Sequence, residues 1–121
     1  MQISKKKLTP KVKKQVYDLF YKVIADIRNP QEAKEFLESF LGDNEKEAIS
    51  RRLAIAYLLK NKKTYAYIKD YLSVSSTTVA SIAREMNKEK GFEVAFKKIQ
   101  ADEWADKWAK KITQVFSKKE R

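Results

Sequence analysis

Hydroxyl side chains at positions 75–78 carry the clearest chemistry in this sequence. A hydroxyl group both donates and accepts hydrogen bonds, so this run can bind phosphate oxygens or the edges of any base. Farther along, Arg84 carries a guanidinium that can bind guanine through two hydrogen bonds. If this segment is a helix with one face outward, the candidate nucleic-acid-binding residues on that face are Ser75, Ser76, Thr77, Thr78, Ala80, Ser81 and Arg84.

Lysines surround this run on both sides. A lysine ammonium binds phosphate as a point charge and carries no sequence information by itself. Each of these lysines is equally compatible with an ordinary solvated surface position. The candidate phosphate-binding residues are Lys60, Lys62, Lys63, Lys69 and Lys88.

Most catalytic chemistry is excluded by composition. The chain has no cysteine and no histidine, which removes disulfides, thiolate chemistry, zinc sites and serine–histidine triads. The acidic residues are scattered among lysines, and no glycine-rich phosphate loop is present. We therefore expect no enzyme, no metal and no cofactor.

The charge balance favours a polyanionic partner. The 121 residues include 27 basic and 16 acidic side chains, for a net charge of +11. Charge of this size on a small domain promotes fast encounter with double-stranded DNA, although it also serves solubility. No apolar run is long enough to span a membrane and the start lacks a signal core, so we expect a cytoplasmic or nucleoid-associated protein.

The apolar spacing around the hydroxyl run predicts a helix-turn-helix at residues 64–86. Two helices that cross at a tight turn explain the pattern better than one continuous helix does. Thr64 can cap the first helix and Ser75 or Ser76 the second, while Ser73 stands where a glycine is usual. Two antiparallel helices without DNA binding are the alternative. The residues predicted to pack inward are Ile68, Leu72, Val74, Val79 and Ile82.

The rest of the chain also reads as helical, so the expected fold class is an all-α multi-helix bundle. Residues 1–8 read as a basic flexible tail, 9–90 as the helical domain, and 91–121 as a C-terminal amphipathic helical extension of one or two helices. The predicted boundary signals are Thr9-Pro10, Asn29-Pro30, a capping box of Asn44 with Glu47, and a break at Gly91.

Apolar stripes exceed what one small core can cover, which favours a homodimer. The stripes lie on the N-terminal helices and the C-terminal segment, and a compact monomer is the alternative. The large residues concerned are Val16, Phe20, Phe36, Phe40, Trp104, Trp108 and Phe116.

From residue 45 to 84 the sequence resembles the tryptophan-repressor family, and more closely its variant without an evident tryptophan role. The matching segments are Arg-Leu-Ala-Ile-Ala-Tyr-Leu-Leu at 52–59 and Val-Ser-Ser-Thr-Thr-Val at 74–79. The resemblance implies an intertwined helical homodimer that presents two recognition helices to DNA. Ser81 stands where the repressors place a ligand-binding arginine and Ile82 where they place a glycine, so tryptophan is not the expected effector.

A sequence-specific transcriptional regulator, with repression as the expected action, is therefore the leading hypothesis. Two other classes stay open. One is a non-specific nucleic-acid or nucleoid-binding protein, which would show a shallow specificity ratio. The other is a protein-interaction module that uses the aromatic C-terminal stripe.

Overall fold

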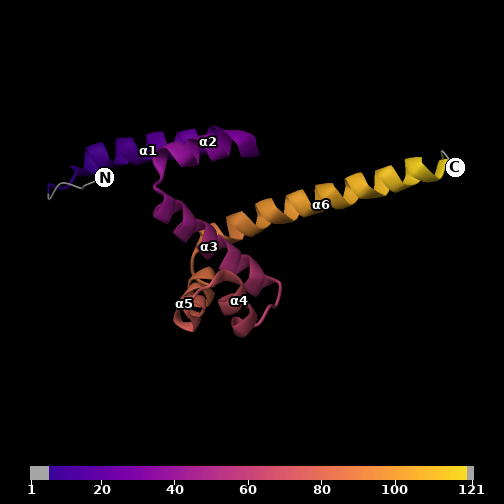
Figure 1. Cartoon of the computed structure of the whole chain (residues 1–121). Helices are drawn as coiled ribbons and strands as arrows, with labels where there is room; N and C mark the ends of the chain where they lie inside the picture. Colours follow the sequence, from indigo (N-terminus) through magenta and orange to yellow (C-terminus); the bar gives the residue numbers. More distant parts are fainter. Residues whose placement is uncertain (1–5, 120–121) are drawn as a thin grey trace. The chain divides into compact units, whose positions relative to one another are not determined.

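The computed structural model describes residues 6–119, with the backbone only at residues 104, 105, 108, 109 and 111–119. Within this part the chain is all-α, as predicted, and no strand is present (Figure 1). The C-terminal region is one helix, and the predicted aromatic stripe of Trp104, Trp108 and Phe116 lies outside the described side chains. The helices are α1 Pro10–Asp26, α2 Pro30–Phe40, α3 Asp43–Lys60, α4 Tyr65–Leu72, α5 Ser76–Met86 and α6 Lys90–Lys119.

The first of two compact units comprises residues 1–46. Its helices begin where the sequence predicts. The Thr9 hydroxyl accepts a hydrogen bond from the backbone N–H of Val12 at 3.3 Å, and the Asn29 side chain accepts one from Glu32 at 2.8 Å. Each cap satisfies a backbone donor that the first helical turn leaves unpaired, and a proline follows each cap.

No residue of α1 or α2 is buried. The two helices meet through rings: Phe20 and Phe36 have centroids 6.3 Å apart, and Phe36 stacks on Phe40 at 4.6 Å. Phe20 nevertheless stays 51% exposed and Phe40 72% exposed. Within its described residues, the first unit thus carries an apolar surface without a buried core of its own.

Two predicted boundaries were wrong. Asn44 lies inside α3, which begins at Asp43, so it cannot be the N-cap residue. The side chain that bonds back to the start of the helix is Glu45, whose Oε1 accepts a hydrogen bond from the Gly42 N–H at 2.9 Å. Glycine is acceptable as an N-cap residue, so the box shifts two residues toward the N-terminus. Gly91 does not break the chain either, because it lies in the first turn of α6 and the break falls at Asn87–Glu89.

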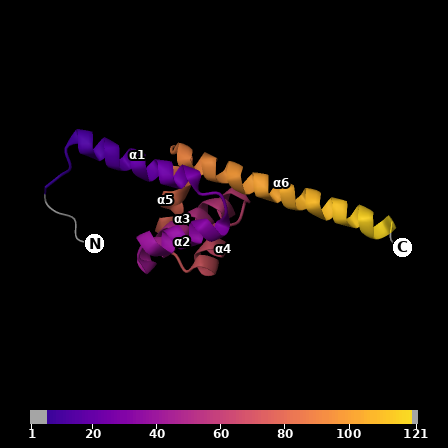
Figure 2. The same ribbon diagram turned by 90° about the horizontal axis from the view of Figure 1, so that it is seen from above.

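The second unit, residues 47–121, has a small apolar core. Its buried residues are Ile55 and Ala56 of α3, Ile68 of α4, and Val79 and Ile82 of α5. The predicted inward residues Leu72 and Val74 are partly buried against it, so the predicted packing pattern is confirmed. Full burial of an aliphatic side chain contributes about 1.5–3 kcal/mol. These contacts hold α4 and α5 together beside α3 (Figure 1). Figure 2 shows α6, of the same unit, as one uninterrupted helix.

The turn between α4 and α5 depends on a left-handed residue. Ser73 has φ 53° and ψ 52°, and its backbone N–H donates to the Lys69 carbonyl. A side chain with a Cβ is disfavoured in this conformation, which explains why a glycine is usual here. The serine keeps the geometry of the turn at a cost in conformational energy.

We expect Ser73→Gly to raise the free energy of unfolding by about 0.5–1 kcal/mol, because relief of the left-handed strain exceeds the entropy that glycine adds to the unfolded chain. Chemical denaturation monitored by circular dichroism measures this change. Ser50→Gly, on the exposed surface of α3, is the matched control and should destabilise by about 0.5 kcal/mol. A destabilised Ser73→Gly would contradict the strain argument.

Candidate nucleic-acid interface

The start of α5 is organised by a pair of hydroxyl groups. Ser75 precedes the helix, and its Oγ accepts a hydrogen bond from the Thr78 N–H at 3.1 Å. The two hydroxyl oxygens of Ser75 and Thr78 are themselves 2.8 Å apart. Both groups are therefore engaged in holding the first turn of the helix, and Ser75, not Ser76, is the cap.

The remaining candidate residues of α5 lie along one stripe. Thr77, Ala80, Ser81 and Arg84 have the i, i+3, i+4, i+7 spacing that places side chains on one face of a helix. This spacing sets them away from the buried Val79 and Ile82. Thr77 and Arg84 are exposed, whereas Ala80 and Ser81 are half-buried.

Ser76 and Thr77 have the most available hydroxyl groups in this turn. Both residues are exposed, and neither hydroxyl makes a hydrogen bond to another described residue. Arg84 likewise forms no ion pair within the described part of the chain. These three side chains can therefore bind a ligand without first breaking an internal contact.

One ion pair connects α5 to α3. Arg52 Nη1 lies 3.6 Å from Glu85 Oε2, with side-chain exposures of 60% and 39%. Ion pairs this exposed contribute little to stability because water screens them. The Arg52 guanidinium does partly compensate the negative charge of Glu85, the neighbour of Arg84 in the sequence.

The candidate lysines do not form one set. Lys60 ends α3, and its Nζ lies 5.3 Å from the centroid of the Phe96 ring of α6. Lys62, in the following turn, has a left-handed backbone with φ 64°. Lys69 in α4 and Lys88 after α5 are exposed, and neither forms an ion pair with another described residue. Lys69 and Lys88 thus remain free to contact phosphate, whereas Lys60 points toward α6.

A ladder of three side chains, formed by Lys63 before α4 and by Tyr67 and Tyr71 on it, was not predicted from the sequence. Lys63 Nζ lies 5.3 Å from the centroid of the Tyr67 ring, and this ring stacks on Tyr71 with centroids 5.6 Å apart. Tyr67 and Tyr71 stay 45% and 68% exposed. The i, i+4, i+8 spacing of the three residues is visible in the sequence and could have revealed the ladder. The hydroxyl groups of Tyr67 and Tyr71 can form hydrogen bonds with a ligand, in addition to the Lys63 ammonium at the end of the ladder.

Membrane-spanning and metal-binding features are both absent from the described residues. No helix there is both long and apolar enough to cross a membrane. No group of three or more acidic side chains is placed to hold a metal ion there.

We expect Ser75→Ala to lower the free energy of unfolding by about 1 kcal/mol, because it removes the N-cap of α5 and the partner of the Thr78 hydroxyl. Ser76→Ala is the matched control and should stay within about 0.5 kcal/mol of the parent protein. Thermal and denaturant unfolding measure both. Equal effects of the two substitutions would contradict the cap assignment.

Comparison with known proteins agrees with this geometry. The family model described as Trp repressor protein matches residues 15–100, which include the whole of α4 and α5. Among solved structures the chain is similar to a TrpR-like protein from Eubacterium eligens ATCC 27750, with 25% identity and a TM-score of 0.67 over 76% of this chain and 96% of that chain. No curated protein matches the chain. Since the family match spans most of its length, the chain belongs to the Trp repressor family of helix-turn-helix DNA-binding regulators.

Proposed function

We propose that this protein is a homodimeric transcriptional regulator, acting as a repressor, that binds specific double-stranded DNA through α4 and α5. The observation that carries the proposal is the stripe of Thr77, Ala80, Ser81 and Arg84 on a helix whose opposite face is buried. A helix held in this way can enter the major groove with its outward side chains against the base edges.

The chemistry of the stripe suggests how bases are read. The methyl groups of Thr77 and Ala80 suit the methyl group of thymine, and the Arg84 guanidinium suits guanine. Because Ser75 and Thr78 are hydrogen-bonded to each other, we assign them to positioning the helix. Direct readout by so few groups is modest, so contacts of lysines with phosphate supply much of the affinity.

The experiment that tests the proposal is selection of bound sequences from a random pool of duplex DNA, followed by titration of the selected duplex at several salt concentrations. If a dimer contacts about 6–10 phosphates, affinity should fall about 10³–10⁵-fold between 50 and 200 mM salt. Failure to enrich any sequence would favour the non-specific alternative. A nearly flat salt response would mean that the charge of +11 serves solubility.

Two variants separate base reading from phosphate binding in the same titration. Arg84→Ala should weaken the selected duplex by a factor that corresponds to about 1–3 kcal/mol and relax preference at one position of each half-site. Lys69→Ala, which removes an exposed cation from α4, should weaken all duplexes alike and lower the salt slope by about one for each phosphate that the lysine binds. Identical behaviour of the two variants would assign Arg84 to the phosphates.

The homodimer is proposed from the first unit. Its helices expose Val16, Leu19, Phe20 and Phe40, and none of their residues is buried. Apolar surface of this kind usually marks an interface between proteins. A second copy supplies a self-complementary apolar surface and also a second recognition helix for the other half-site.

Sedimentation equilibrium at micromolar concentration should therefore give about twice the chain mass of 14.2 kDa. Phe40 is 72% exposed within one chain, and the proposed second copy would bury its ring. We therefore expect Phe40→Asp to shift the protein toward the monomer, because the dimer would have to bury the new charge. Ser39→Asp, on the preceding exposed residue of α2, is the control and should remain dimeric. A monomeric parent protein would favour packing of the apolar helices within one chain.

Tryptophan is not part of the proposal as an effector. Ile82 is 4% exposed and belongs to the buried core, so the space for an indole ring beside it is filled. Ser81 offers a hydroxyl group where a cation would be needed for the ligand carboxylate.

A further inference from the structure

The ion pair between α3 and α5 has little to contribute to stability. Arg52 Nη1 lies 3.6 Å from Glu85 Oε2, and the two side chains are 60% and 39% exposed. Water screens a pair this exposed, and holding two long side chains in one geometry costs entropy. The position of the pair on α5 points to a different role.

Glu85 stands at the border between the two faces of α5. It lies three residues after the buried Ile82 and four residues after Ser81 of the outward stripe. Residues three and four apart are neighbours on a helix surface, so the Glu85 carboxylate lies beside the stripe. Glu85 is also the only acidic residue of α5.

A carboxylate is unfavourable at this border for two reasons. The last turn of a helix carries a partial negative charge, which favours a cation and disfavours an acid. The outward stripe faces phosphates in the proposed function, and an uncompensated carboxylate beside it would repel them over about 8–10 Å at ordinary salt. Neither the stability of the helix nor attraction to DNA therefore explains an acid at this position.

Arg52 is placed to compensate this charge. It lies three and four residues before the buried Ile55 and Ala56, so it shares the face of α3 that packs in the core. Its guanidinium meets the Glu85 carboxylate at the rim of the core that α3 and α5 share. The positive charge is thus supplied by a helix that carries none of the outward stripe.

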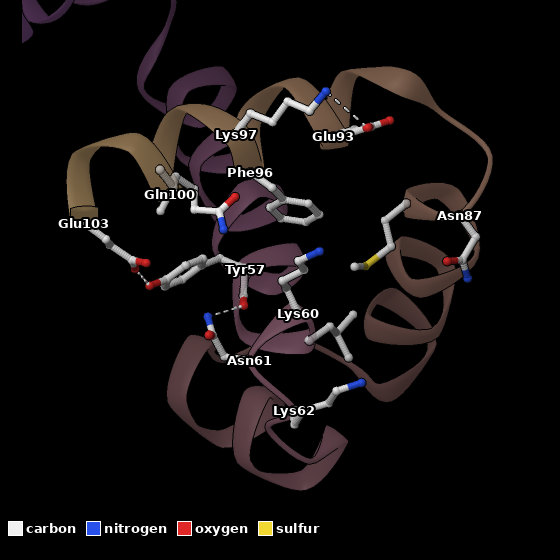
Figure 3. A pocket seen from close by; sticks show the side chains of 13 residues that line it. Tyr57, Lys60, Asn61, Lys62, Asn87, Glu93, Phe96, Lys97, Gln100 and Glu103 are labelled. Atoms are coloured by element: carbon white, nitrogen blue, oxygen red, sulfur yellow. Dashed lines mark hydrogen bonds and ion pairs between the residues drawn. The ribbon is translucent and has the colours of Figure 1, made fainter. Parts of the chain in front are cut away.

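Two further acids line the open groove beside the end of α5, and both have partners (Figure 3). Glu93 pairs with Lys97 within α6 at 3.4 Å, and Glu103 accepts a hydrogen bond from the Tyr57 hydroxyl of α3. These contacts hold α6, either within itself or to α3. The ion pair between α3 and α5 differs from them, because it reaches the helix that carries the outward stripe.

We propose that Arg52 is a positioning residue for DNA binding. By pairing with Glu85 it lowers the negative charge at the edge of the outward stripe, so that the stripe can approach the phosphates. In this way α3 takes part in DNA recognition through its charge, without a contact of its own with DNA. This role rests on the proposed function, and different outcomes of the test refute the two.

The test is titration of the selected duplex with the full chain and its variants at about 50 and 200 mM salt. We expect Arg52→Gln to weaken binding about three- to tenfold at the lower salt, because it leaves Glu85 uncompensated, and by less at the higher salt. Arg52→Lys keeps the charge and should bind as the parent protein does. Glu85→Gln should bind at least as tightly as the parent protein, and adding Arg52→Gln to it should cost little.

Arg51→Gln is the matched control. Arg51 is the preceding residue of α3, and it pairs with Glu47 of the same helix at 2.7 Å. The substitution removes the same charge from the chain but leaves the pair between α3 and α5 intact, so the affinity should stay close to that of the parent protein. Losses of equal size in Arg51→Gln and Arg52→Gln would overturn the role of Arg52 and assign both effects to net charge.

Three other results would also overturn this role. Weakening by Glu85→Gln that matches the weakening by Arg52→Gln would make the pair a structural tether. An equal cost of Arg52→Gln with and without Glu85→Gln would mean that Arg52 binds a phosphate itself. A loss in Arg52→Lys as large as that in Arg52→Gln would show that charge is not the cause. Each of these results leaves the proposed function intact, whereas a parent protein that binds no duplex would refute the proposed function and this role with it.

Discussion

Burial of Ile68 from α4 against Val79 and Ile82 of α5 is the contact on which the rest of the arrangement depends. Helices of 8 and 11 residues are too short to persist in water by propensity. Their orientation therefore comes from these side chains and from their packing against Ile55 and Ala56 of α3. The outward stripe of α5 is positioned as a consequence, because a helix whose one face is fixed by packing has its opposite face fixed as well.

The two units of the chain obtain their order differently. Among the side chains that the structure describes, the second unit holds five that are buried, whereas α1 and α2 of the first unit contain none and meet through partly exposed rings. Marginal stability leaves little tolerance for uncovered apolar surface. The apolar surface of α1 and α2 is therefore what the proposed dimer would cover, whereas the second unit carries a core of its own.

Local signals in the sequence predicted most of the fold, because they depend on neighbours a few residues apart. The inward spacing at Ile68, Val79 and Ile82, the caps at Thr9 and Thr64 and the boundary at Asn29-Pro30 are of this kind. The predicted start of α3 was wrong because the sequence offers two capping boxes with the same spacing, Asn44 with Glu47 and Gly42 with Glu45, and the second one forms. The contact of Lys60 with Phe96 could not be predicted, since these residues are far apart in the chain and only the packed helices bring them together. For the same reason the lysines looked equivalent in the sequence, although their surroundings differ.

The outward stripe of α5 has one more consequence, for how this protein can change. Thr77 and Arg84 are exposed and belong to none of the contacts that hold the core, whereas Val79 and Ile82 between them carry the packing. Substitutions at the exposed positions of a helix usually alter stability by less than about 0.5 kcal/mol. Natural variation can therefore rewrite the chemistry that this helix presents, one side chain at a time, while each intermediate still folds.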